Sequence, residues 1–151
     1  MTAPSLKETL SSAVKDAMRK KDKLRLVTLR MAQAAIKQIE IDERRELGDE
    51  EVLKVLDKML KQRRDAASQY DGAGRAELAD KERAEMVIIE EFMPAALTED
   101  ELDGLIHQAI SATGAQSMQD MGSVMNTLRP QVLGRVEMGH LSKKVRAALS
   151  G

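Results

Sequence analysis

The sequence predicts an all-α protein, with an N-terminal bundle of long helices followed by a small C-terminal three-helix domain. Three observations point to this class. Charged residues make up 32% of the 151 residues and there are only three prolines, a composition that suits helices. Aromatic residues make up 1%, too few for a β-sandwich or barrel, which uses aromatic and β-branched side chains. Apolar residues also recur at three- and four-residue intervals along most of the chain.

The first two helices are expected on either side of a polar corner. Ser5 and Glu8 have the spacing of a capping box, which predicts that a helix starts directly after Ser5. Residues 20–22 are two lysines and an aspartate and are expected to form a tight turn. From residue 22 to about residue 44 the apolar positions cover more than one stripe of the second helix. We therefore expect this helix to be central and to contact several neighbours.

The third and fourth helices are delimited by glycine and proline. Gly48 predicts a break, with Asp49 as the N-cap of a helix whose apolar face extends to Tyr70. Glycines at positions 72 and 74 interrupt the chain again. A fourth helix is expected from about residue 75 to residue 93, and Pro94 ends it because its ring disfavours helical geometry in the preceding residue.

The composition changes after Pro94. Residues 1–97 contain 19 basic and 19 acidic side chains, whereas residues 98–151 contain 5 and 6. Capping-box spacings at 98/101 and 117/120 predict two short helices, and a glycine-containing connection from Pro130 to Gly139 precedes the last helix. We therefore divide the chain into an N-terminal helical bundle, residues 1–94, and a C-terminal helical domain, residues 95–151.

Catalytic and metal-binding groups are hard to find. The chain has no cysteine, no nucleophile elbow and no phosphate-binding glycine loop. Its two histidines, His107 and His140, have no second ligand three or four residues downstream, and Asp103 is placed to form a surface ion pair with His107. We predict no catalytic residue, no metal site and no cofactor. Whether the chain has an activity of its own stays open.

The C-terminal segment is locally basic. From Gln119 onward there are five basic residues and two acidic ones, although the whole chain has a net charge of −1. The basic residues are Arg129, Arg135, Lys143, Lys144 and Arg146. A local positive surface can bind phosphates, and a small bundle with a chance basic end is an equal alternative. Because aromatic side chains for stacking are absent, any nucleic-acid contact is expected to the backbone rather than to bases.

Short strings distributed along the chain resemble the GatB/YqeY-like family, which is named after the tail of the amidotransferase B subunit and a small bacterial homologue. They occur in the family's order. The strings are Arg30-Met31, Ala34-Ala35-Ile36-Lys37, Asp49-Glu50-Glu51-Val52, Lys61-Gln62-Arg63-Arg64-Asp65, Ala73-Gly74-Arg75, Lys81-Glu82, Ala84-Glu85, Phe92-Met93-Pro94, Met121-Gly122-Ser123-Val124-Met125, Gly134-Arg135 and the Leu141–Leu149 segment. The resemblance covers nearly the whole chain.

This resemblance implies an all-helical protein related to the tail of a tRNA-dependent amidotransferase, a carbon–nitrogen ligase that uses glutamine as amido-nitrogen donor. In that enzyme the tail helps to hold the tRNA. By resemblance, the five basic residues of the C-terminal segment are the candidate RNA-binding residues. The catalytic part of the amidotransferase has no counterpart in these 151 residues.

Two functions follow as hypotheses. The first is a non-catalytic tRNA- or RNA-binding module. The alternative is a helical adaptor that binds another protein, such as an amidotransferase or an aminoacyl-tRNA synthetase, without binding RNA. No apolar run approaches the roughly 20 residues that span a bilayer, and residues 1–10 lack the apolar stretch of a signal peptide. We therefore expect a soluble, cytoplasmic protein with no membrane partner.

Overall fold

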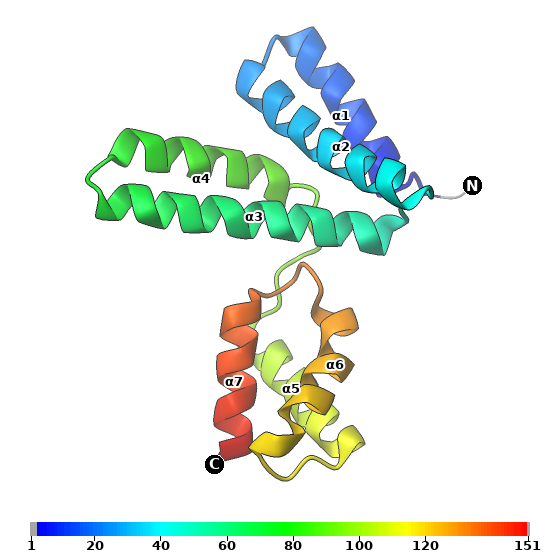
Figure 1. Ribbon diagram of the computed structural model, residues 1–151, viewed down its shortest axis with the longest axis vertical. Coiled ribbons are helices and arrows are strands. Elements are labelled where there is room, and N and C mark those ends of the chain that lie inside the picture. Colours follow the sequence, from blue (N-terminus) through cyan, green and yellow to red (C-terminus); the bar gives the residue numbers. More distant parts are fainter. Residues whose placement is uncertain (1–2, 151) are drawn as a thin grey trace. The chain divides into compact units, whose positions relative to one another are not determined.

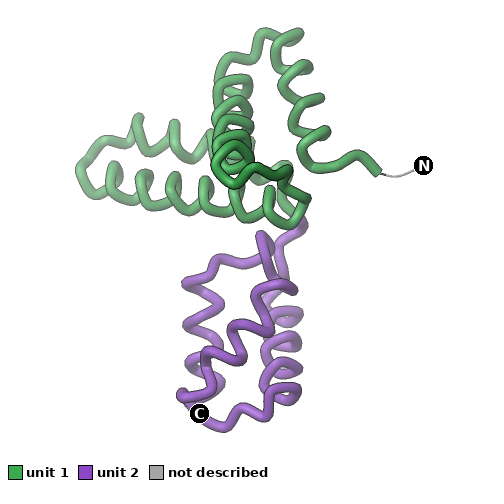
Figure 2. Tube along the Cα trace, turned by 45° about the vertical axis from the view of Figure 1, so that its right-hand side comes forward, with its two compact units in different colours: residues 1–93 green, residues 94–151 purple. Residues whose placement is uncertain are grey.

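A computed structural model describes residues 3–150 and confirms the all-α class (Figure 1). The chain divides into two compact units, Met1–Met93 and Pro94–Gly151 (Figure 2). Its helices are α1 (Leu6–Lys20), α2 (Lys23–Glu43), α3 (Asp49–Gly72), α4 (Ala76–Glu90), α5 (Glu99–Thr113), the 3-10 turn η1 (Met118–Asp120), α6 (Met121–Val132) and α7 (Met138–Ser150). Over residues 3–150, none of these helices has the length and apolar character needed to cross a membrane.

Local caps define the hairpin of α1 and α2. At the start of α1, Ser5 Oγ accepts from the Glu8 N–H at 3.1 Å and the Glu8 carboxylate accepts from the Ser5 N–H at 3.3 Å, which confirms the predicted capping box. The C-cap of α1 is Lys21, whose φ of 57° lies in the left-handed region. Asp22 Oδ1 then accepts from the Arg25 N–H at 3.2 Å and caps α2. The predicted polar corner is thus a C-cap followed directly by an N-cap.

The prediction for the start of α3 is wrong by one residue. Gly48 is the N-cap, and Asp49 is the first residue of the helix. The Asp49 side chain serves α1 instead, because its Oδ1 accepts from the Leu6 N–H at 2.8 Å. That N–H belongs to the first turn of α1 and has no partner within its own helix. A carboxylate at this position also interacts favourably with the dipole of α3.

The predicted end of α4 is also wrong. The helix ends at Glu90 rather than at Met93. The N–H groups of Phe92 and Met93 bond to carbonyls three residues earlier, at 3.0 and 3.1 Å, so the chain forms turns before it reaches Pro94. The side chains of Phe92 and Met93 pack against the core of the first unit. This packing pulls the chain out of helical geometry ahead of the proline.

The connection predicted from Pro130 to Gly139 is shorter than expected. Helix α6 continues through Pro130 to Val132, and α7 starts at Met138, so that Gly139 lies inside α7. Val132 is fully buried in the core of the second unit. Its burial compensates for the backbone hydrogen bond that Pro130 cannot donate. Gly134, with a φ of 73°, lies in the remaining turn, where the left-handed conformation favours glycine.

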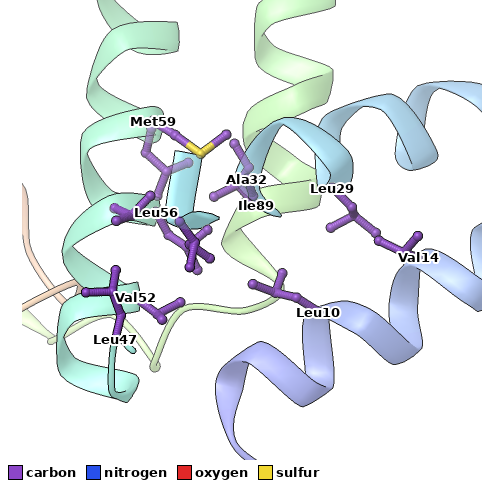
Figure 3. Packing of buried hydrophobic residues seen from close by; sticks show 12 residues of the cluster. Leu10, Val14, Leu29, Ala32, Leu47, Val52, Leu56, Met59 and Ile89 are labelled. Carbon is purple, nitrogen blue, oxygen red and sulfur yellow. The ribbon is translucent and has the colours of Figure 1, made fainter. Parts of the chain in front are cut away.

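Each unit has its own apolar core. In the first unit, Leu10, Leu29, Leu56 and Ile89 come from four different helices and belong to one cluster of buried residues (Figure 3). In the second unit, buried aliphatic residues from α5, α6 and α7 form a separate cluster. Its fully buried members are Leu102, Val124, Leu128, Val132, Leu141 and Val145.

A largely buried ion pair joins α3 to α4. Arg63 Nε lies 3.0 Å from Glu85 Oε2, and the two side chains keep only 12% and 9% of their exposure. Arg63 Nη1 also donates to the carbonyl of Met59 at 3.2 Å. The buried charges are therefore paired with each other and with the backbone, as burial of charge requires.

Helix α2 contacts α1, α3 and α4, which confirms its predicted central position. One of its apolar stripes nevertheless lies largely outside these contacts. Val27 is 54% exposed and Ile41 is 60% exposed, and both lie on the side away from the buried Leu29 and Ile36. Helix α2 therefore has one apolar face in the core and one in contact with solvent.

Candidate nucleic-acid interface

The five predicted RNA-binding residues all lie in the second unit, where the structure separates them into three environments. Arg129 is on α6, Arg135 is in the turn between α6 and α7, and the other three are on α7. The same unit carries six acidic residues, four of them in or next to the first turn of α5. Carboxylates from an earlier part of the chain thus offset the local excess of basic residues that was counted from Gln119 onward.

Lys144 is paired with the acidic start of α5. Its ammonium group lies 2.5 Å from Asp103 Oδ1 and also bonds to Glu99. His140 Nε2 lies 2.7 Å from the other oxygen of Glu99. Asp103 therefore pairs with Lys144, so the predicted ion pair between Asp103 and His107 is wrong. These contacts connect α5 to α7 and occupy Lys144.

The pKa values in this cluster shift as ion pairing requires. Hydrogen bonds to Asp103 and Glu99 raise the pKa of Lys144 above its ordinary value. Hydrogen bonds from Lys144 and then His140 lower the pKa of Glu99. Each partner stabilises the charged form of the other. Lys144 is therefore held as a cation that two carboxylates already neutralise.

Sequence reasoning missed the acidic half of this cluster, although a signal was present. Glu99 and Asp103 are four residues apart and so share one face of α5. His140 and Lys144 have the same spacing on α7. Two complementary pairs with matched spacing indicate two helices that lie alongside each other.

Arg135 bonds to the segment that precedes α5. Its Nε donates to the carbonyl of Ala95 at 3.0 Å, and its own carbonyl accepts from the Leu97 N–H at 2.9 Å. Its N–H donates to the carbonyl of Val132 at 2.8 Å. The residue thus fastens the segment before α5 to the end of α6. We assign its guanidinium to this contact rather than to an open cationic surface.

Three of the five residues remain accessible. Lys143 and Arg146 are exposed on α7, on the side opposite the fully buried Leu141 and Val145. Arg129 is exposed on the neighbouring α6, where its Nη1 donates to Asn126 Oδ1 at 3.0 Å. Among the residues described by the structure, no carboxylate lies within ion-pair distance of these three cations. They form the accessible positive surface of the second unit.

The described residues offer no metal site and one notable pocket. Within residues 3–150, no three histidine, aspartate or glutamate side chains come together in a way that could hold a metal ion. A pocket of about 320 Å³ lies between α1 and α2. Two of its lining residues, Lys7 and Glu40, are paired at 2.5 Å, and Glu40 also accepts from the Leu47 N–H at 2.9 Å. Lys7 and Glu40 are therefore already partnered within the protein.

Curated proteins similar to this chain include three fungal ones, each named altered inheritance of mitochondria protein 41, mitochondrial. The protein from Kluyveromyces lactis is 33% identical over 92% of this chain and 73% of its own length. The protein from Vanderwaltozyma polyspora is 29% identical over 93% and 74%, and that from Pyrenophora tritici-repentis is 26% identical over 91% and 77%. The expectation of a cytoplasmic protein is wrong by this comparison, because these relatives are named as mitochondrial and point to mitochondria instead.

The family comparison covers both units. The Yqey-like protein family matches residues 7–149, from the first turn of α1 almost to the end of α7. This range includes the strings on which the resemblance was based, and it includes Arg129, Lys143 and Arg146. The chain therefore belongs to the YqeY-like family.

Proposed function

We propose that this YqeY-like protein is a non-catalytic RNA-binding protein whose second unit contacts the phosphate backbone through Lys143, Arg146 and Arg129. The observation that carries the proposal is the exposed, unpaired state of Lys143 and Arg146 on α7. They are three residues apart and so extend from the same side of the helix. A side chain of this kind can exchange water and counterions for a phosphate at little cost.

The contrast with Lys144 supports this choice of residues. Lys144 would have to leave two carboxylates before it could bind a phosphate. The Nε of Arg135 is bonded to the carbonyl of Ala95, so only its Nη groups could face a phosphate and the side chain could not reorient freely. The proposed interface is thus smaller than the five-residue interface expected from the sequence.

A tRNA is the RNA we propose. The support is the resemblance to the tail of the tRNA-dependent amidotransferase, which carries the same type of helical domain. On this proposal an amidotransferase or an aminoacyl-tRNA synthetase is a candidate partner that would act on the bound tRNA. The carbon–nitrogen ligase chemistry would belong to that partner.

The test is a titration of labelled tRNA with the full chain at several salt concentrations, followed by fluorescence anisotropy. The variant is Lys143→Gln combined with Arg146→Gln, which removes two phosphate contacts without introducing negative charge. We expect weaker binding, and we expect the slope of log affinity against log salt to become shallower by about 2. A matched control, Lys54→Gln combined with Lys58→Gln, removes the same charge from exposed positions of α3 and should leave both quantities unchanged.

Three results would overturn the proposal. If the α7 variant binds tRNA as the wild type does, the interface is wrong. If the α3 control loses as much affinity as the α7 variant, binding depends on total charge rather than on this surface. A failure of the wild type to bind tRNA at low salt would refute RNA binding itself.

A further inference from the structure

The solvent-facing side of α2 carries a regular apolar row. Its positions follow alternating intervals of three and four residues, which is the a/d spacing of a coiled-coil heptad. The exposed row consists of Leu24, Val27, Met31, Ala34, Gln38 and Ile41. Apart from Gln38 its members are apolar, and each is classed as exposed, with Val27 and Ile41 the most open at 54% and 60%.

Most of this row is separate from the face that α2 contributes to its own unit, and Met31, whose sulfur lies 3.6 Å from Arg63 Nη2 of α3, borders that face. The buried residues of α2 are Thr28, Leu29, Ala32 and Ile36, and they pack in the core with α1, α3 and α4. With 3.6 residues per turn, the exposed row lies on the opposite side of the helix from Leu29 and Ile36. Large apolar side chains in such a continuous row mark an interaction surface more often than scattered exposed ones do.

A basic row runs along one edge of the exposed row. It occupies one position in each heptad, the g position, directly before each a residue. The basic row consists of Lys23, Arg30 and Lys37 on α2, spaced seven residues apart, and of Arg44, the left-handed C-cap residue directly after the helix. None of the four forms an ion pair with a carboxylate among the residues that the structure describes. Arg30 makes only a contact of 3.7 Å with the sulfur of Met18.

We infer that the exposed row of α2 is a docking site for an amphipathic helix of another protein, with acidic residues along the edge that faces the basic row. Because the exposed row has heptad spacing, the a and d side chains of a second helix can pack between its side chains. The helical part of the basic row, from Lys23 to Lys37, supplies charge complementarity along about 21 Å of the helix. This surface lies in the first unit, and the inference is independent of RNA binding by the second.

A second copy of this chain fits the surface poorly. Antiparallel packing of two α2 helices would place one basic row against the other. In parallel packing, the g positions of one copy would face the e positions of the other. The e positions are Thr28, Ala35 and Asp42, so only Lys37 would meet an acidic residue, Asp42. Opposing like charges disfavour a complex, so the charge pattern selects a different, acidic partner.

An anionic membrane fits the surface less well than a helix does. Interfacial helices insert bulky Leu, Phe and Trp side chains into the lipid, whereas this row contains Ala34 and the polar Gln38. Gln38 Nε2 bonds to Asp42 Oδ1 at 2.9 Å and lies at an a position. A polar residue at an a position is a device that fixes register between two helices.

The inference can be tested with two synthetic peptides of the length of α2, 21 residues. Both have the same Leu and Ile seam at a and d. One has Glu at its e and g positions, and the other has Lys. In an anisotropy titration with the full chain, we expect the Glu peptide to bind about tenfold more tightly than the Lys peptide. Reversal of three charges in the basic row, K23E/R30E/K37E, should invert this preference.

Two further variants distinguish binding at the exposed row of α2 from nonspecific hydrophobic binding of the peptide. Val27→Ser combined with Ile41→Ser should weaken binding of the Glu peptide by more than about tenfold, because two aliphatic contacts are lost. Val87→Ser is the control, since Val87 is a 62% exposed valine on α4 and its replacement should change nothing. Lys143→Gln combined with Arg146→Gln should also leave peptide binding intact.

Four results would overturn the inference. The peptides could bind equally, or the Val87 control could weaken binding as much as the α2 variant does. The full chain could self-associate through this face, shown by a concentration-dependent mass that V27S/I41S abolishes. It could instead bind phosphatidylglycerol vesicles through this face while ignoring the Glu peptide.

Discussion

Removal of one member of the Arg63–Glu85 pair should destabilise the first unit much more than removal of both. Glu85→Leu leaves the guanidinium of Arg63 in a site where its side chain is only 12% exposed. Arg63→Met leaves the Glu85 carboxylate in the same position. An unpaired charge in such a site costs about 3 kcal/mol of unfolding free energy, since its partner and its solvation are both lost.

The double variant R63M/E85L removes both charges and replaces them with apolar side chains of similar volume. The site between α3 and α4 then contains no group that needs a charged partner. Exchanges of this kind are often neutral or stabilising. We therefore expect the double variant to lie within about 1 kcal/mol of the wild type.

The assay uses the only tyrosine of the chain. Tyr70 lies in α3 and the chain has no tryptophan, so tyrosine fluorescence in a urea titration reports on the first unit. Asp80→Ala is the control, because it breaks the exposed contact with Arg83 and should leave the midpoint nearly unchanged. If the double variant is as unstable as either single one, or if both singles match the wild type, the reasoning from buried charge is refuted.

Two predictions concern the second unit and can be followed by methyl NMR of its core during urea titration. Thr98→Ala removes the capping box of α5, where Thr98 Oγ1 accepts from the Glu101 N–H at 3.1 Å, and should cost about 1 kcal/mol of that unit's stability. An unchanged midpoint would contradict this role of the cap. Because Lys144 and His140 lower the folded-state pKa of Glu99 below 4.5, the stabilisation from this carboxylate is present above pH 4.5 and is lost as the pH falls through the lowered value. Glu99→Gln should therefore reduce the acid sensitivity of the second unit in this range, and an identical acid profile would show that the pair contributes nothing.

The start of α1, the corner at Lys21 and Asp22, and the start of α5 were predictable because a cap is a local feature. Ser5 and Glu8, like Thr98 and Glu101, satisfy each other's backbone within one turn. No distant residue needs to be known for such a prediction.

The errors have a common origin in contacts between distant parts of the chain. The sequence predicts that Asp49 caps its own helix, and its contact with α1 is missed because the N–H that it accepts from is 43 residues earlier. The end of α6 was placed too early because the burial of Val132 depends on the other helices of its unit. Lys144 was counted as an RNA ligand because Glu99 lies 45 residues before it.

The one-sided exposure of α2 was missed for a different reason. Two apolar faces were both visible in the sequence as stripes. Periodicity alone does not say which stripe meets the core and which meets solvent, so the sequence predicts neighbours for both. The three surrounding helices cover only one side of α2.

The contact between Asp49 and the first turn of α1 has a consequence for the order in which the protein is made. Helix α1 is synthesised first, yet the acceptor for its Leu6 N–H comes from the first residue of α3. Glu40, which bonds to Lys7 near the same end of α1 and to the Leu47 N–H, is also translated later. While the chain is still emerging from the ribosome, the capping box of Ser5 and Glu8 can form, but the Leu6 N–H and the Lys7 side chain lack these later partners. The beginning of α1 becomes a fixed part of the bundle only when the start of α3 has left the ribosome and folded back onto it.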